Sequence, residues 1–183
     1  MEALTNFELN ILDWIQTNMQ SAFADCFFPL ITKLGDAGIF WILVAAVMLL
    51  FPKTRKTGAM MGLALIFGLI VCNMTMKPLI ARIRPYDINT AVTLIVEKMH
   101  DFSFPSGHTT ASFEGAVVLL MRDKRLGIPA MILAVLIAFS RLYLYVHFPT
   151  DVLAGAVLGT LFAVLAVYLI NRICEKWTGR KKA

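Results

Sequence analysis

The residues best suited to chemistry lie in the stretch 140–151, where an apolar run ends in a group of polar side chains. His147 precedes Asp151 by four residues, and Pro149 between them breaks the helix. A carboxylate at such a junction can orient an imidazole ring, as a catalytic histidine requires. Arg141 adds a cation to the same stretch. Because unpaired polar groups at this depth are costly, the cluster favours a catalytic role.

A second polar cluster, residues 77–85, contains two cations with helical spacing. Lys77 and Arg84 are seven residues apart and would share one face of a helix, whereas Arg82 would point away from that face. Two cations that converge at the membrane edge suit a phosphate group, and Arg84 can form paired hydrogen bonds with it. The alternative is that these side chains extend to the membrane interface without binding a ligand, and we favour this alternative for Arg82.

A third cluster, residues 105–108, opens another apolar run. Ser106 suits the N-cap of a helix, and Gly107 lets backbone N–H groups approach a ligand closely. A helix N-terminus is a ready anion site, so His108 in the first turn would lie beside a bound anion. An ordinary cap with an interfacial histidine is the alternative. Glu114, deeper in the same run, either forms a hydrogen bond inside the bundle or tunes the site.

The composition indicates the kind of molecule that must position these clusters. Hydrophobic residues make up 58% of the 183 residues, charged residues make up 16%, and the mean hydropathy is +0.73. Soluble proteins contain about 25% charged residues. We therefore expect an all-α polytopic membrane protein, with residues 1–183 as a single membrane-embedded domain. The net charge of +5 is concentrated around the apolar runs, so no nucleic-acid partner is expected.

Six apolar runs follow an apolar stripe at the N-terminus, and they predict a six-transmembrane-helix bundle with an N-terminal amphipathic helix. The first and fourth runs are short for a hydrocarbon core of ~30 Å. A Gly-x-x-x-Gly pattern at Gly155 and Gly159 favours close helix packing. The first residues lack the positively charged segment of a signal peptide, so we expect no signal peptide. The stripe consists of Leu4, Phe7, Ile11, Trp14 and Ile15, and the runs are 21–34, 38–52, 58–80, 107–121, 127–147 and 151–171.

Basic residues gather after the second, fourth and sixth runs. If every run spans the membrane, all three groups lie on one side, which is cytoplasmic by the positive-inside rule. Both termini would then be inside, and the three polar clusters would face the extracytoplasmic side of the cell membrane. The groups are Lys53, Arg55 and Lys56; Arg122, Lys124 and Arg125; and Arg172, Lys176, Arg180, Lys181 and Lys182.

The three clusters, in this order, resemble the signature of the type 2 phosphatidic acid phosphatase superfamily, which also includes vanadium haloperoxidases and glucose-6-phosphatase. The resemblance spans Lys77 to Asp151, and the apolar runs extend it over most of the chain. It implies a metal-independent phosphatase on a six-helix membrane bundle, without a cofactor. Tyr145 departs from the pattern, because a small residue is usual two positions before the histidine.

The resemblance also implies a division of roles. His147, supported by Asp151, is similar to the nucleophile that forms a phosphohistidine, and His108 is similar to the acid that protonates the leaving group and then activates water. Cationic and backbone groups can neutralise a transferring phosphoryl group without a metal, and the three cysteines lack metal-ligand spacing. The expected phosphate-binding residues are Lys77, Arg84, Ser106, Gly107 and Arg141.

A site at the outer ends of membrane helices meets phosphates at the depth of lipid headgroups. Small bacterial undecaprenyl diphosphate phosphatases are the nearest resemblance in size, which implies hydrolysis of undecaprenyl diphosphate to undecaprenyl phosphate and phosphate for cell-wall synthesis. Phosphatidylglycerophosphate or phosphatidate phosphatase activity is the alternative. A non-catalytic lipid-binding or transport protein is disfavoured by the retention of both histidines and Asp151. The sequence leaves open the physiological substrate, the oligomeric state and the roles of Glu114 and Tyr145.

Overall fold

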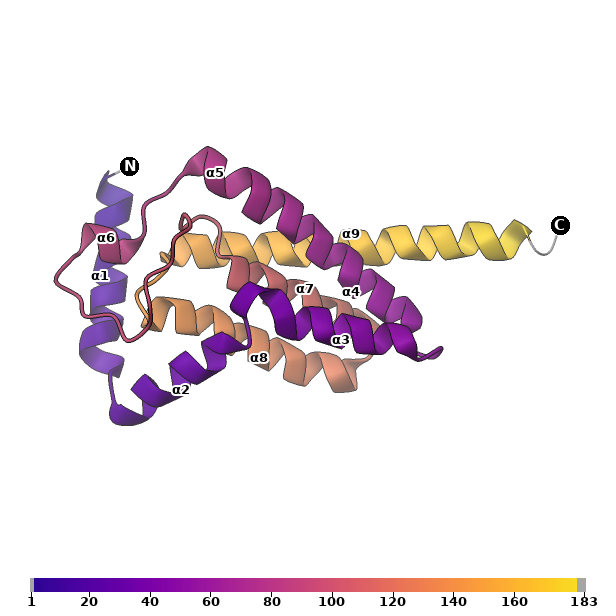
Figure 1. The fold of residues 1–183 in the computed structure, drawn as a ribbon, viewed down its shortest axis with the longest axis horizontal. Coiled ribbons are helices and arrows are strands. Elements are labelled where there is room, and N and C mark those ends of the chain that lie inside the picture. Colours follow the sequence, from indigo (N-terminus) through magenta and orange to yellow (C-terminus); the bar gives the residue numbers. More distant parts are fainter. Residues whose placement is uncertain (1, 181–183) are drawn as a thin grey trace.

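A computed structural model describes residues 2–180 as helices joined by turns and loops, with no β-strand in that range (Figure 1). The predicted all-α fold is therefore confirmed for this part of the chain. Helix α7 (Gly107–Arg122) packs against α4 (Arg55–Gly68), α8 (Lys124–Tyr143) and α9 (Pro149–Arg180). The apolar core between these helices includes Trp41, Met60, Ala64, Val118, Ala134 and Ala163.

Four helical paths among the described residues are long and apolar enough to cross a membrane, rather than the six that we predicted. Helix α7 is not one of them, because its 16 residues span only ~24 Å, less than the ~30 Å of a hydrocarbon core. The four candidate spans are Ala22–Leu50, Arg55–Ile88, Lys124–Tyr143 and Pro149–Trp177.

The first candidate span joins two runs that we expected to cross separately, 21–34 and 38–52. Helices α2 (Ala22–Lys33) and α3 (Ile39–Leu50) have 12 residues each, or ~18 Å, so neither is long enough alone. A short 3₁₀ turn, η1 (Asp36–Gly38), connects them without reversing the chain (Figure 1). Left-handed backbone at two residues of this turn bends the path: Ala37 at φ 49° and Gly38 at φ 66°.

The second candidate span returns to the other end of the bundle. It runs through α4, the π-helix η2 (Leu69–Met76) and α5 (Lys77–Ile80). The helix ends there, because Ala81 adopts a left-handed conformation with φ 47° and Arg84 is extended before Pro85. The prediction that Lys77 and Arg84 share one helical face is therefore wrong.

A short helix, α6 (Pro85–Ile88), and a long loop lead to α7. The Ser106 side chain accepts a hydrogen bond from Thr109 N, which confirms the predicted N-cap. A Cβ atom at Gly155 would lie 2.8 Å from Ser106 O, and one at Gly159 would lie 2.5 Å from Thr110 O. These two glycines let α9 approach α7 closely, as their spacing predicted.

Helix α1 (Glu2–Met19) lies across the ends of the other helices, near α6 (Figure 1). Its buried residues are Glu8, Leu12 and Ile15, whereas Phe7 is 62% exposed and Trp14 is 60% exposed. The predicted stripe therefore does not face the bundle as a unit. The buried face follows the spacing i, i+4, i+7 and includes a carboxylate.

The predicted alternation of basic residues agrees with the arrangement of the helices. The turn after α3, the turn between α7 and α8 and the end of α9 all lie at the end of the bundle opposite α1 (Figure 1). Helix α9 begins beside α1 and ends at the opposite end of the bundle, so the prediction that both termini are on one side is wrong (Figure 1). Lys181 and Lys182 lie outside the described residues.

Candidate active site

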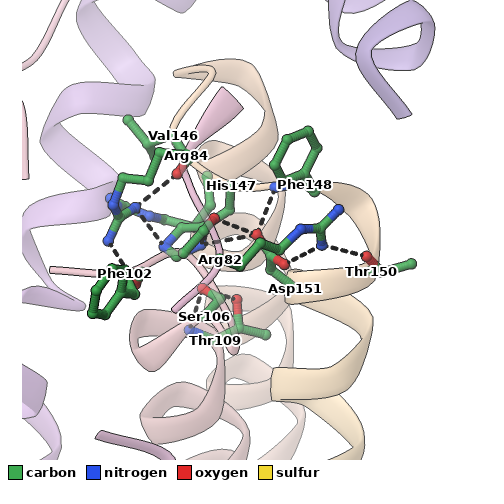
Figure 2. A network of polar contacts seen from close by, with 12 residues as sticks. Arg82, Arg84, Phe102, Ser106, Thr109, Val146, His147, Phe148, Thr150 and Asp151 are labelled. Carbon is green, nitrogen blue, oxygen red and sulfur yellow. Dashed lines mark hydrogen bonds and ion pairs between the residues drawn. The ribbon is translucent and has the colours of Figure 1, made fainter. Parts of the chain in front are cut away.

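The turn between α8 and α9 brings His147 and Asp151 together (Figure 2). Pro149 occupies the first position of α9, where its missing N–H costs nothing. Asp151, two residues later, accepts a hydrogen bond from Phe148 N through Oδ2, at 2.9 Å, in the manner of a capping box. The same Oδ2 lies 3.5 Å from His147 Nδ1. Helix capping therefore places the carboxylate beside the imidazole, and both side chains are almost fully buried.

Two further side chains bind the Asp151 carboxylate. Ser103 Oγ donates to Oδ2 at 2.5 Å and lies 3.4 Å from His147 Nδ1. Arg82 Nη1 donates to Oδ1 at 2.5 Å. The prediction that Arg82 points away from the site is wrong, because the left-handed residue Ala81 turns the chain before it. Asp151 thus has three donors besides the imidazole, and they fix its position.

The other side of the Arg82 guanidinium binds α1. Arg82 Nη2 donates to Glu8 Oε2 at 2.5 Å. Its Nη1 donates to Thr150 Oγ1 at 2.7 Å (Figure 2). Glu8 Oε1 accepts from the backbone N and the Oγ1 of Thr150, at 2.9 and 2.6 Å. The guanidinium lies 3.9 Å from the centre of the Phe148 ring. Arg82 therefore bridges two buried carboxylates, one from α1 and one from the predicted catalytic pair.

No motif indicated Glu8, because α1 is distant in sequence from all three clusters. One signal was available: Glu8 lies four and seven residues before the buried Leu12 and Ile15, on the same face. A carboxylate on an apolar helix face usually has a buried partner.

The cations Lys77 and Arg84 converge, as predicted, although they do so through a loop rather than along a helix. Lys77 Nζ pairs with Asp101 Oδ2, and Arg84 Nη2 donates to Asp101 Oδ1 at 2.5 Å. Arg84 Nη1 donates to Val146 O at 2.7 Å and lies 3.3 Å from His147 Nε2 (Figure 2). The Asp101 carboxylate therefore lies between two cations, next to the predicted nucleophile. A phosphate group could take the same position.

Burial and neighbouring charges shift the pKa values of His147 and Asp101, which lie outside the membrane helices. Burial lowers the pKa of His147 well below its usual range, and the positive charges of Arg84 and Arg141 add to this effect. Burial alone would raise the pKa of Asp101, but the ion pairs with Lys77 and Arg84 outweigh it and lower the pKa to about 2. The imidazole is therefore neutral near pH 7. With the Nδ1 proton facing Asp151, the Nε2 lone pair faces Arg84.

Arg141 lies close enough to His147 to influence its charge, but it is held by other partners. Its Nη1 donates to Thr32 Oγ1 of α2, and its Nη2 lies 3.2 Å from Met99 Sδ. The side chain is buried, and its Nε has no hydrogen-bond partner among the described residues. One donor of Arg141 is therefore free for a ligand.

The Ser106–His108 segment joins the site through α9 and η1. Ser106 N donates to Asp151 O at 3.1 Å, which ties the start of α7 to the start of α9. A Cβ at Gly107 would lie 3.0 Å from Asn73 Oδ1, so the glycine permits this close approach. His108 Nε2 lies 2.8 Å from Asp36 Oδ1. Like His147, His108 therefore has a carboxylate beside it, and Asp36 was not recognised from the sequence.

A cavity of about 620 Å³ leads from this site into the bundle between α3 and the α4–η2 path. Lys77, Asp101 and His108 line its polar end. Apolar side chains line the rest, including Ala45, Leu49, Leu65 and Ile66. The arrangement suits a ligand with an anionic head and an apolar chain.

Residues 57–174, more than half of the chain, match the sequence family described as the PAP2 superfamily. The chain belongs to the PAP2 superfamily. The resemblance indicated by the three motifs is therefore confirmed. An undecaprenyl-diphosphatase of Sulfolobus acidocaldarius is 36% identical over 130 residues, which cover 70% of this chain and 63% of that protein.

Two solved structures extend the PAP2 match to most of the chain. Aquifex aeolicus LpxE has a TM-score of 0.78 at 26% identity, covering 88% of this chain and 95% of that one. A transmembrane PAP2-type phosphatidylglycerolphosphate phosphatase of Bacillus subtilis has a TM-score of 0.74 at 28% identity, covering 96% and 88%. The membrane-helix arrangement is thus shared with known PAP2 proteins.

Tyr145 is the departure from the PAP2 pattern, and its backbone is unusual as well, with φ 60°. Its hydroxyl donates to Asp13 Oδ1 of α1 at 2.6 Å and accepts from Asn89 Nδ2 at 3.1 Å. Burial raises the pKa of Tyr145, and the bond to Asp13 raises it further, so the hydroxyl stays a donor. Tyr145 therefore ties the turn between α8 and α9 to α1, next to the contact made by Glu8.

Proposed function

We propose that the chain is an integral membrane phosphatase for lipid phosphates and diphosphates, and that undecaprenyl diphosphate is its physiological substrate. The observation that carries this proposal is a neutral, buried His147 beside Asp151 and Arg84, where Arg84 pairs with Asp101 at the polar end of an apolar cavity. A similar protein named as an undecaprenyl-diphosphatase supports the substrate. The products would be undecaprenyl phosphate and phosphate, which links the reaction to cell-wall synthesis.

In the first step, His147 Nε2 attacks the phosphorus atom while the bond to the leaving oxygen breaks. His108 gives its proton to that oxygen, so a phosphohistidine and the free lipid alcohol or monophosphate form. Asp151 accepts a hydrogen bond from Nδ1–H and stabilises the charged ring. Positive and backbone donors neutralise the phosphoryl oxygens, and we assign this role to Lys77, Arg84, Arg141, Ser106 and Gly107.

In the second step, His108 takes a proton from a water molecule, whose oxygen attacks the phosphorus atom. The P–N bond breaks, phosphate leaves, and His147 returns to its neutral form. Asp36, 2.8 Å from His108 Nε2, would hold the ring so that Nδ1 can exchange the proton. Each histidine thus has a carboxylate that positions it.

The cations replace the metal ion that many phosphoryl-transfer enzymes use, so we propose that the reaction needs no metal or other cofactor. We further propose that residues 1–183 act as one domain in the cell membrane. The four candidate spans and the shorter α7 would make five crossings. Because the basic turns lie at the opposite end of the bundle, the site would face the extracytoplasmic side, with α1 at that surface.

Phosphatidylglycerophosphate is a second candidate substrate, because a phosphatase named for it has a TM-score of 0.74 with this chain.

The test is phosphate release from a panel of detergent-solubilised lipids: undecaprenyl diphosphate, phosphatidylglycerophosphate and phosphatidate, each with and without a chelator. We expect hydrolysis that survives EDTA and that vanadate inhibits, since vanadate mimics the five-coordinate transition state. No release from any lipid would favour a non-catalytic lipid-binding or transport protein. Loss of activity with EDTA, restored by Mg²⁺, would overturn the metal-free mechanism.

A further inference from the structure

Glu114 is a buried acid for which the proposed mechanism has no use. It lies on α7, is 1% exposed and lines the cavity that leads from the site. Among the described residues, its Oε1 atom has no hydrogen-bond partner and Glu114 forms no ion pair. A buried polar atom without a partner is rare in native structures and requires an explanation.

The position of Glu114 along α7 relates it to the phosphate site. Glu114 follows His108 by six residues, which corresponds to ~9 Å along the helix axis. The N-terminus of α7 is the site end, so Glu114 lies deeper in the bundle than His108. Beyond it, Leu65, Ile66 and Leu49 make the cavity apolar. Glu114 therefore lies at the transition from headgroup to chain.

The carboxyl group is held against the backbone of the neighbouring helix. A Cβ atom at Gly68 would lie 2.4 Å from Glu114 Oε1 and 2.8 Å from Oε2. Gly68 is the last residue of α4, immediately before the π-helix η2. Such π-helical segments often occur at functional sites. The glycine leaves room for the carboxyl group, so this placement is built into the packing of α4 on α7.

The chemistry of Glu114 suggests which part of a lipid it meets. In its neutral form, a carboxyl group has one O–H donor. In phosphatidate, the first carbonyl acceptors beyond the phosphate are the acyl esters, a few bonds from the phosphorus atom. A polyprenyl diphosphate has only hydrocarbon there. We propose that Glu114 is a specificity-determining residue that donates a hydrogen bond to an acyl ester carbonyl, so that the enzyme also accepts glycerolipid phosphates.

This inference rests on the proposed phosphatase function, and it is tested by comparing two lipids that differ only in the carbonyls. The probes are dioleoyl phosphatidate, with ester links, and its di-O-oleyl ether analogue, in the same detergent. We expect the wild type to show a higher kcat/KM for the ester by about twofold to tenfold, the range for one hydrogen bond between neutral groups. Glu114→Gln, which keeps a donor, should retain this ratio. Glu114→Met, of similar size and without a donor, should bring it to about one.

The ester-to-ether ratio is internal to each variant, so partial loss of folded enzyme does not change it. Glu2→Met, at an exposed acid of α1, is the matched control and should keep the wild-type ratio. If Glu114→Met is inactive, Gly68→Ala takes its place, because the added methyl group displaces the carboxyl group without changing its chemistry. A wild-type ratio of one, or an unchanged ratio in the Met and Gly68→Ala variants, overturns the role of Glu114. Failure of the phosphatase function itself would appear as no hydrolysis of either probe or of undecaprenyl diphosphate.

Discussion

Arg82→Lys tests whether Arg82 positions Asp151, as its hydrogen bonds indicate, or is only an interfacial cation, as its place in the sequence suggested. The guanidinium donates to Asp151, Thr150 and Glu8 at 2.5 to 2.7 Å, and its side chain is 20% exposed. Lysine keeps the charge but lacks the planar fork, so it cannot bridge the two carboxylates in the same geometry. Asp151 and Glu8 are 0% and 1% exposed, so an unmatched carboxylate remains buried.

The loss of one charge-assisted hydrogen bond to Asp151 costs about 1.5–3 kcal/mol. If Asp151 supports the charged imidazole mainly in the transition state, this corresponds to a fall in kcat of roughly tenfold to a hundredfold. KM should change little, because the guanidinium of Arg82 binds Asp151, Thr150 and Glu8 rather than the predicted phosphate site. Glu8→Gln should also lower kcat, by a smaller factor, since Glu8 acts on Asp151 indirectly, through Arg82 and Thr150.

The assay is kcat and KM on undecaprenyl diphosphate in detergent, with thermal unfolding of each variant measured in parallel. Arg125→Lys, an exposed arginine at the opposite end of the bundle, is the matched control and should behave as wild type. A double-mutant cycle of Arg82→Lys with Glu8→Gln should show coupling, because the two side chains share one network. An Arg82→Lys enzyme with kcat within twofold of wild type would refute the reasoning, because Arg82 would then be only an interfacial cation.

Four further predictions concern the predicted phosphate site and its orientation. Asp101→Asn should lower KM about twofold to fivefold, the effect of losing a half-exposed competing ion pair; an unchanged or higher KM would show that Asp101 helps to bind substrate. The pKa of Asp101 is about 2, below its ordinary 3.8, so its ion pairs stabilise the fold above pH 3.8 and are lost as pH falls through 2. The fall in KM caused by Asp101→Asn should therefore be equal at pH 5 and pH 8. His147→Ala should abolish the acid-quenched, base-stable phosphoenzyme, whereas His108→Ala should still form it from a p-nitrophenyl ester; the opposite pattern would reverse the two roles. In a Cys-free variant in intact cells, an impermeant thiol reagent should label a cysteine at Asn89 and not one at Lys124, and the reverse labelling would invert the topology.

The predicted chemistry came from residues close together in the sequence. The structure brings these residues into contact where local backbone geometry determines their positions. His147 and Asp151 are four residues apart, and a proline-initiated helix with an acidic cap brings them together almost regardless of the rest of the fold. Ser106 caps α7 for the same local reason. Family membership also followed from the order of the motifs, which is a property of the sequence alone.

The errors arose where one residue changes the direction of the chain. Helical periodicity placed Arg82 away from Lys77 and Arg84, but left-handed backbone at Ala81 ends the helix and turns Arg82 towards Asp151. Alanine carries no sequence signal for that conformation. The turn at Ala37 and Gly38 likewise joins two apolar runs into one path, which hydropathy alone separates.

The sequence by itself determined the membrane class, the all-helical fold and the candidate residues for phosphoryl transfer, because composition and local spacing encode them. Only the tertiary structure decided which distant carboxylates complete the site. Glu8, Asp36 and Asp101 come from α1, η1 and a loop, and each meets a motif residue through packing between elements far apart in the chain. Such contacts depend on where helices cross and end, and no local pattern records that geometry.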